Sequence, residues 1–284
     1  MNDRIHWCLA TPSRTWITAL ILTLVPGFGW LAYGWIALIT LRFGATQGFI
    51  TGCIVCVPSA LMQAAGIDAL IAIVIGLWIS ALVLGERIAM PYAITALSLV
   101  IGSWAASSLF FDQGSMAKLW VPEVTRAIES TGAFQNLENI DVKLMSNITG
   151  IRQISVVIIL MAITALIFAR WWQARLFNPG GFQTEFLTQD GSSIWAIALM
   201  GISFLVMQLS VEHPWIIPLG IALQLPLMVI GLSVVHFWLR QKPQRIPLLV
   251  LTYVMIVLGL HWPFTLLGAA QCIIKLKRER ITPD

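Results

Sequence analysis

Few side chains in this sequence are spaced for covalent or metal chemistry. Cys53 and Cys56 have the CxxC spacing of redox and metal sites, but they lie inside an apolar stretch, where burial disfavours the reactive thiolate. The four histidines form no HxxxH or HExxH pattern, and no P-loop, GxSxG or Rossmann glycine pattern is present: His6, His213, His236, His261. We therefore expect no catalytic residues, no metal site and no cofactor, and a protein that is not an enzyme.

A second set of polar residues suits binding rather than catalysis. These residues fall near one end of the predicted membrane-spanning stretches described below: Gln63, Asp68, Gln208, Glu212, His213, Trp215. If they gather, they form a pocket on the outer face, with the polar 112–150 segment as a lid. Two plainer interpretations remain open. Asp68 also fits a first-turn acid of its own helix, and 112–150 also fits an amphipathic pair lying on the membrane surface.

The third polar feature is the stretch from Ala169 to Phe186 on the opposite face. Asn178-Pro179-Gly180-Gly181 is a turn signal, and Arg170, Trp171, Trp172 and Arg175 close a span ahead of it. One interpretation is a structural turn. The alternative is a loop that docks a cytosolic or membrane partner through these residues: Arg170, Trp171, Trp172, Arg175, Asn178, Pro179, Gly180, Gly181, Phe182.

The composition indicates which environment these elements need. Of 284 residues, 58% are hydrophobic and 11% are charged, whereas a soluble domain carries roughly 25% charged residues. This excludes an ordinary soluble enzyme and a disordered chain, and four scattered cysteines exclude a disulfide scaffold. The basic residues are spread over short loops, so we expect no nucleic-acid partner. The lipid bilayer is the expected partner.

Six stretches are long and apolar enough to cross a hydrocarbon core of ~30 Å as helices. They are Gln47–Ala65, Asp68–Leu84, Ile88–Phe111, Ile151–Trp171, Ser193–Val211 and Trp215–Leu239. Two terminal stretches, Trp16–Leu41 and Ile246–Lys275, contain breakers at Pro26-Gly27 and at His261-Trp262-Pro263. Each is one kinked helix or a hairpin of two short helices.

The distribution of basic residues favours two hairpins. If both hairpins return to their starting side, thirteen of the 17 Lys and Arg share one face: Arg4, Arg14, Arg42, Arg87, Arg170, Arg175, Arg240, Lys242, Arg245, Lys275, Lys277, Arg278, Arg280. The other four lie opposite: Lys118, Arg126, Lys143, Arg152. Every other arrangement gives a smaller bias. Because basic residues concentrate in cytoplasmic loops, both termini are predicted to be cytoplasmic.

Three consecutive spans carry a small residue at every fourth position, which places each trio on one helical ridge: Gly48, Gly52, Cys56; Ala72, Gly76, Ser80; Ser98, Gly102, Ala106. Small residues let helix backbones approach closely in lipid. We expect these ridges to meet within the chain rather than to dock another protein's helix.

The stretch from Arg170 to Phe186 also carries a family resemblance. Arg170-Trp171-Trp172-Gln173-Ala174, Leu176, Asn178-Pro179-Gly180-Gly181-Phe182 and Glu185-Phe186 resemble the RYWQALLYNPGGF…EF signature of the YybS-like bacterial membrane proteins. The proline-broken N-terminal hairpin and the C-terminal layout around Trp262-Pro263 resemble that family too. Trp171 and Phe177 replace tyrosines, and Arg175 replaces an apolar residue. The family is uncharacterised, and it is remotely similar to the substrate-binding components of energy-coupling factor transporters.

Together these features predict an all-α polytopic bundle of about six full spans plus two terminal hairpins, or 8–10 membrane segments. Residues 1–284 form a single integral membrane domain with an outer amphipathic segment at 112–150. The expected function is a small-molecule-binding or transport-related membrane subunit that lacks its own energy source. The alternative is a scaffold or assembly factor that docks a partner through the 170–186 loop. We expect a bacterial inner membrane location.

Overall fold

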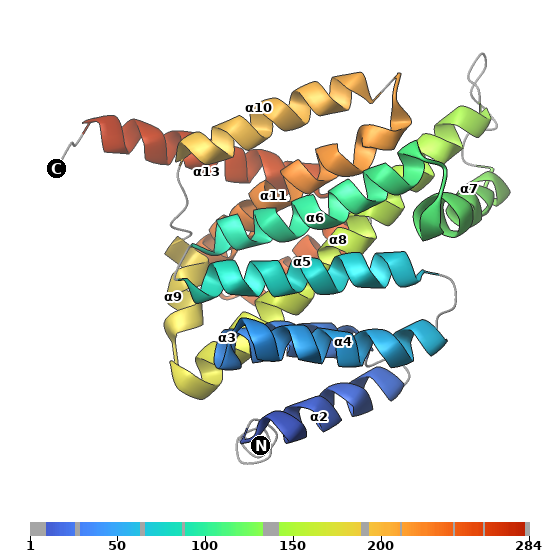
Figure 1. Ribbon diagram of the computed structural model, residues 1–284. Coiled ribbons are helices and arrows are strands. Elements are labelled where there is room, and N and C mark those ends of the chain that lie inside the picture. Colours follow the sequence, from blue (N-terminus) through green and yellow to red (C-terminus); the bar gives the residue numbers. More distant parts are fainter. Residues whose placement is uncertain are drawn as a thin grey trace.

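The computed structural model describes residues 10–25, 29–62, 66–86, 89–132, 142–188, 193–210, 212–240, 242–257 and 259–281. Every element among these residues is helical, so the predicted all-α class is confirmed for them. Most of the helices run roughly parallel or antiparallel to a common axis, which lies across the page in Figure 1. Unbroken apolar sequence and the need to satisfy backbone polar groups within each segment explain this architecture.

Each of the six predicted spans contains a helix. They are α4 (Ala45–Met62), α5 (Ile67–Gly85), α6 (Met90–Phe110), α8 (Val142–Phe177), α10 (Ser193–Leu209) and α11 (Ile217–Leu239). Four of them are long and apolar enough to cross a membrane: α5, α6, α8, and α11 together with the short turn of helix before it, η2 (Pro214–Ile216). α4 and α10 are apolar but shorter. A membrane location follows from these four helices.

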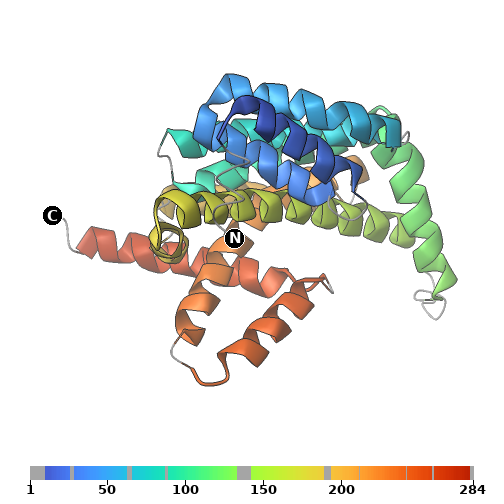
Figure 2. The ribbon, with the colours of Figure 1, turned by 90° about the horizontal axis from the view of Figure 1, so that it is seen from below.

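Both terminal stretches are divided into two helices at the predicted breakers. The first forms α2 (Pro12–Leu24) and α3 (Gly29–Phe43), and the second forms α12 (Arg245–Val257) and α13 (Trp262–Ile281). Each pair turns back on itself, so α2 starts and α3 ends at the same end of the bundle, as do α12 and α13 (Figures 1 and 2). The turn between α12 and α13 lies part-way along the bundle axis. Each terminal stretch is thus two helices rather than one kinked helix.

The polar 112–150 segment differs in part from its prediction. Its first half is helical, as expected, in η1 (Met116–Trp120) and α7 (Val121–Ser130), and α7 packs against α8. Residues 133–141 lie outside the described part of the chain. Residues 142–150 do not form a separate short helix but are the first turns of α8, which continues without a break for 36 residues. Extending an existing helix costs less free energy than nucleating a new one, which explains why α8 is continuous.

The predicted small-residue ridges pack against neighbouring helices of the same chain. A Cβ on Gly52 would lie 2.7 Å from the Val74 side chain of α5, and one on Gly76 would lie 2.9 Å from the Leu97 side chain of α6. A Cβ on Gly102 would lie 2.6 Å from the Cβ of Ala222 on α11. The packing prediction is confirmed at these positions, because each glycine admits a neighbouring helix that a larger residue would hold away.

A very close approach between helices joins α11 to α13. A Cβ on Gly231 would lie 1.9 Å from the Phe264 carbonyl oxygen, and a Cβ on Gly268 would lie 1.9 Å from the Leu227 carbonyl oxygen. Two glycines thus face each other across a crossing at which the backbones touch. This contact anchors α13, although the chain that precedes it projects away from the bundle (Figure 2).

Candidate ligand cavity

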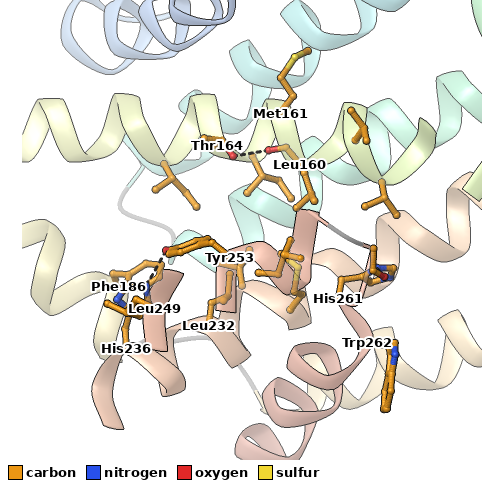
Figure 3. A pocket seen from close by; sticks show the side chains of 18 of the residues that line it. Leu160, Met161, Thr164, Phe186, Leu232, His236, Leu249, Tyr253, His261 and Trp262 are labelled. Atoms are coloured by element: carbon orange, nitrogen blue, oxygen red, sulfur yellow. Dashed lines mark hydrogen bonds between the residues drawn. The ribbon is translucent and has the colours of Figure 1, made fainter. Parts of the chain in front are cut away.

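One face of α8 lines a large cavity. The lining positions recur every three or four residues along the helix: Thr149, Arg152, Gln153, Val156, Val157, Leu160, Met161, Ile163, Thr164, Ile167, Trp171. This spacing is that of a single helical face. α9 (Gly181–Thr188), α11, α12 and the connection from α12 to α13 supply the remaining walls, and the enclosed volume is about 1380 Å³. Figure 3 shows its central part.

The lined part of α8 is about as long as the membrane is thick. Arg152 and Arg170 bracket a stretch without charged residues. Eighteen residue steps at 1.5 Å give roughly 27 Å, close to the ~30 Å of the hydrocarbon core. Long cationic side chains favour the lipid–water boundary, so this spacing suits one arginine at each boundary. The cavity runs along most of this uncharged stretch of α8.

α12 forms the thin outer wall of the cavity. It packs only lightly, and chiefly against α11. A hydrogen bond joins the two helices, with 2.9 Å between Nε2 of His236 and the Tyr253 hydroxyl (Figure 3). The cavity is open on one side, because Val157 and Tyr253 line it and remain 63% and 47% exposed. The open side lies between α8 and α12.

The Asn178-Pro179-Gly180-Gly181 turn positions α9 at one end of the cavity. Gly180 has a φ of +89°, which favours glycine, and the Asn178 amide donates to the Ala174 carbonyl at 2.8 Å to end α8. The chain then reverses, and Phe182 and Phe186 of α9 line the cavity. Phe186 packs edge-on against His236, with 5.6 Å between ring centroids.

An ion pair holds α9 against the end of α8. The Glu185 carboxylate accepts from Nε of Arg170 at 2.8 Å and lies 2.7 Å from Nη2 of the same guanidinium. Both side chains are about a quarter exposed. Arg170 also donates to the Gln173 side chain. The Arg170–Glu185 ion pair thus fixes the position of α9 at this end of the cavity.

The other end of the cavity, near the turn from α12 to α13, contains an unpartnered polar atom. His261 is 1% exposed, and its Nδ1 lies 3.1 Å from the Gly259 carbonyl oxygen. Its Nε2 is buried and has no hydrogen-bond partner among the described residues. His261 and Trp262 line the cavity (Figure 3). Arg152 lines it too.

None of the described residues of the predicted outer pocket lines this cavity. Gln63 lies outside the described residues. Asp68 stands in the first turn of α5, where its carboxylate accepts from the Ser115 amide at 3.0 Å and from Nε1 of Trp104 at 3.1 Å. The carboxylate therefore joins α5, α6 and the turn that precedes η1. It acts here as a structural acceptor.

The remaining outer-pocket residues lie around the connection from α10 to α11. Gln208 is in the last turn of α10, and the exposed Glu212 follows that helix. The rings of His213 and Trp215 are neighbours, with centroids 6.4 Å apart, and Trp215 packs on Phe110 at 4.9 Å. Trp215 also borders a shallow depression of about 270 Å³ with Phe110 and Phe111, which contains neither Asp68 nor Glu212.

The predicted docking loop is divided between cavity and surface. Trp171 and Phe182 line the cavity, and Trp172 packs edge-on against Trp35 with 5.9 Å between ring centroids. Arg175 covers the Trp171 ring at 5.3 Å. The turn residues are exposed: Asn178, Pro179, Gly180. The interpretation of the loop as a structural turn accounts for the observed geometry.

Several cavity residues were not singled out in the sequence: Arg152, Gln153, Thr164, His236, Tyr253. A signal was present in α8, because Arg152, Gln153 and Thr164 interrupt an apolar helix on one face. No comparable signal marked Tyr253, since its role depends on where α12 lies. Among the described residues no three His, Cys, Asp or Glu side chains gather as metal ligands.

Comparison with known proteins adds no further identification: no family model, curated protein or solved structure matches this chain.

Proposed function

We propose that this protein is an integral membrane protein that binds one amphipathic small molecule in the cavity between α8, α9, α11 and α12. The observation that carries the proposal is the cavity itself, with its volume of about 1380 Å³ and its exposure beside the thin wall formed by α12. Ligand pockets usually enclose about 300–1,000 Å³ and are mostly apolar with a few polar groups. This cavity exceeds that range, which suits a ligand with a long hydrocarbon chain.

The geometry favours entry from the bilayer. The opening lies between α8 and α12, and the lining side chains between the polar ends are mainly aliphatic, such as Leu160, Met161 and Leu232. A ligand whose chain dissolves in lipid can enter sideways without passing through water, because that chain is apolar throughout. The protein carries no recognised nucleotide motif, so a transport role needs an energy-supplying partner.

We further propose that the chain has about six full spans and two terminal hairpins, in a bacterial inner membrane with both termini in the cytoplasm. The helix ends and turns that carry Arg14, Arg42, Arg175, Arg240 and Lys242 lie at the end of the bundle where α2 begins and α13 ends (Figures 1 and 2). α7, with Arg126, lies at the other end. Positively charged loops favour the cytoplasmic side. Membership of the YybS-like family, suggested by the Arg170–Phe186 stretch, is part of this proposal.

A thermal-shift measurement with dodecanol tests the binding function. A ligand that binds only the folded state at 100 times its Kd stabilises it by about 2.7 kcal/mol. We expect dodecanol to raise the Tm of the detergent-solubilised wild type. The double variant Val157→Trp/Thr164→Trp places two indoles on the cavity face of α8, beside the opening, and should lose this increase.

The matched control is Val57→Trp/Leu205→Trp. Val57 on α4 is 63% exposed, as is Val157, and Leu205 on α10 is also 63% exposed. Neither control residue lines the cavity. The control should keep the full dodecanol effect. An equal effect of dodecanol on the wild type and on the filled variant would refute binding in this cavity.

The exposure of the Asn178–Gly180 turn supports the second candidate function, partner docking at this turn. Asn178→Ser/Pro179→Ser should abolish a stable complex with a co-purifying protein and leave the dodecanol effect unchanged. Survival of the complex in this variant would argue against docking there.

A further inference from the structure

The two ends of the cavity differ in how their polar groups are satisfied. At the end formed by α9, His236 and Tyr253 hydrogen-bond to each other, and Arg240 and Arg245 are exposed. At the end near the α12–α13 connection, Nε2 of His261 is buried and has no hydrogen-bond partner within the described part of the chain. A buried polar atom without a hydrogen bond costs free energy, so a ligand group that satisfies it binds more tightly there.

The hydrogen bond at the other ring nitrogen determines what Nε2 can do. A carbonyl oxygen only accepts, so Nδ1 of His261 carries the proton that it donates to Gly259. The ring is 1% exposed, and burial disfavours a charged imidazole, because desolvation penalises the ionised form. A neutral ring protonated at Nδ1 presents a lone pair at Nε2. The matching ligand group is therefore a hydroxyl donor.

Arg152 supplies the second half of the recognition chemistry. It lies on the cavity face of α8, close enough to His261 to affect it electrostatically, and no described residue forms an ion pair with it. The cavity lining contains three arginines and no Asp or Glu. A guanidinium pairs best with an anionic oxygen, often through two hydrogen bonds. The position of Arg152 also suits the lipid–water boundary, where the head group of an amphiphile resides.

We propose that Arg152 and His261 form the head-group site for an amphiphile whose head combines an anionic oxygen with a hydroxyl, such as a phosphate monoester that keeps one proton. The anionic oxygens accept hydrogen bonds from the Arg152 guanidinium, and the P–O–H group donates to Nε2 of His261. The chain of the ligand then lies along α8 towards Tyr253. This proposal rests on the proposed function, because the chain requires the cavity.

Three probes with one chain separate the two interactions: dodecyl phosphate, dodecyl methyl phosphate and dodecanol. The first has an anion and a hydroxyl, the second has only the anion, and the third has only the hydroxyl. Native mass spectrometry of the detergent-solubilised full chain gives the Kd of each. At pH 6 about half of a phosphate monoester keeps its second proton. Inorganic phosphate, as a fourth ligand, distinguishes an amphiphile site from a site for free phosphate.

We expect dodecyl phosphate to bind the wild type about tenfold more tightly than dodecyl methyl phosphate, and inorganic phosphate to bind at least a hundredfold more weakly. Arg152→Gln should weaken both alkyl phosphates about tenfold and leave dodecanol unchanged. His261→Leu should remove the preference for the monoester. His261→Gln should restore part of it, because the amide oxygen also accepts. The matched control, Arg126→Gln, removes a cation from α7 outside the cavity and should change none of these values.

The outcomes separate the two proposals. If dodecanol binds the wild type but Arg152→Gln binds both alkyl phosphates as tightly as the wild type does, the head-group site is wrong and the cavity function stands. If inorganic phosphate binds as tightly as dodecyl phosphate, the site does not recognise an amphiphile. If none of the three alkyl probes binds the wild type, the proposed function itself fails.

Discussion

At the scale of single residues, two acidic side chains hold neighbouring helices together near helix termini. Asp68 accepts hydrogen bonds from Ser115 and Trp104, and Glu185 pairs with Arg170. Each carboxylate joins segments that are distant in sequence or separated by a turn. In a bundle whose helices are apolar, such charge-assisted contacts are directional, whereas dispersion forces are not.

Removing the Asp68 carboxylate should cost stability. Asp68→Ala leaves the Ser115 amide and Nε1 of Trp104 without their acceptor, which should lower the free energy of unfolding by about 1–3 kcal/mol. Glu86→Ala, at the exposed opposite end of α5, is the control and should have little effect. Thermal unfolding in detergent measures both. Equal Tm values for Asp68→Ala and the wild type would contradict the structural role of this carboxylate.

The two ion pairs differ in burial, which predicts different contributions. The Arg170–Glu185 side chains are 25% and 23% exposed, whereas both side chains of Arg126–Glu123 are 68% exposed. Glu185→Gln should destabilise α9 by roughly 1–2 kcal/mol, and Glu123→Gln should cost no more than about 0.5 kcal/mol. Hydrogen exchange at the α9 amides reports the loosening directly. Unchanged protection of α9 in Glu185→Gln would show that the pair is dispensable.

At the scale of elements, close backbone contact orders the helices. The ridges through Gly52, Gly76 and Gly102 were predictable, because residues four positions apart lie on the same face of a helix. The contact between Gly231 and Gly268 was not, since these glycines lie on separate helices and neither belongs to a repeat. Which helix α13 would pack against depends on the α12–α13 turn, whose geometry the sequence pattern does not specify.

The crossing of α11 and α13 makes the strongest packing prediction. A methyl group on either glycine would lie 1.9 Å from a backbone oxygen of the facing helix, so the helices must separate. Gly231→Ala and Gly268→Ala should each destabilise the protein by about 3 kcal/mol or more, above the usual cost of overpacking. Gly201→Ala on α10 is the control, because nothing lies within 4 Å of its added Cβ.

The control should be neutral or stabilising by up to about 1 kcal/mol, since alanine favours a helix over glycine. Thermal unfolding with circular dichroism gives all three values. If Gly231→Ala and Gly268→Ala are as stable as Gly201→Ala, the contact between α11 and α13 is wrong.

At the scale of the whole molecule, two features distinguish parts of the bundle: basic residues mark one end, and the cavity marks one side. Basic helix ends gather at one end of the axis, and the cavity opens to the side. The first property was predictable from the sequence, because breakers and basic residues are visible in it. The cavity was not, because it arises from the light packing of α12 beside α8. Sequence reasoning instead placed a pocket near Asp68, whose carboxylate serves a structural contact.

Sidedness is tested by labelling single cysteines in a chain with its native cysteines replaced by serine. A cysteine at Ser130, exposed at the end of α7, should react with a membrane-impermeant thiol reagent applied to intact cells. A cysteine at Gln244, exposed before α12, should react only after the membrane is opened. The reverse pattern would place the basic end outside and overturn the proposed orientation.

The central claim is that one amphiphile occupies the cavity, and counting molecules retained from the membrane tests it most directly. Native mass spectrometry of the wild type, gently extracted from its membrane, should show about one bound amphiphile per chain. The same peak should appear in Val57→Trp/Leu205→Trp and be absent from Val157→Trp/Thr164→Trp. A wild type that emerges without a ligand, or a filled variant that retains the same ligand, would contradict the account.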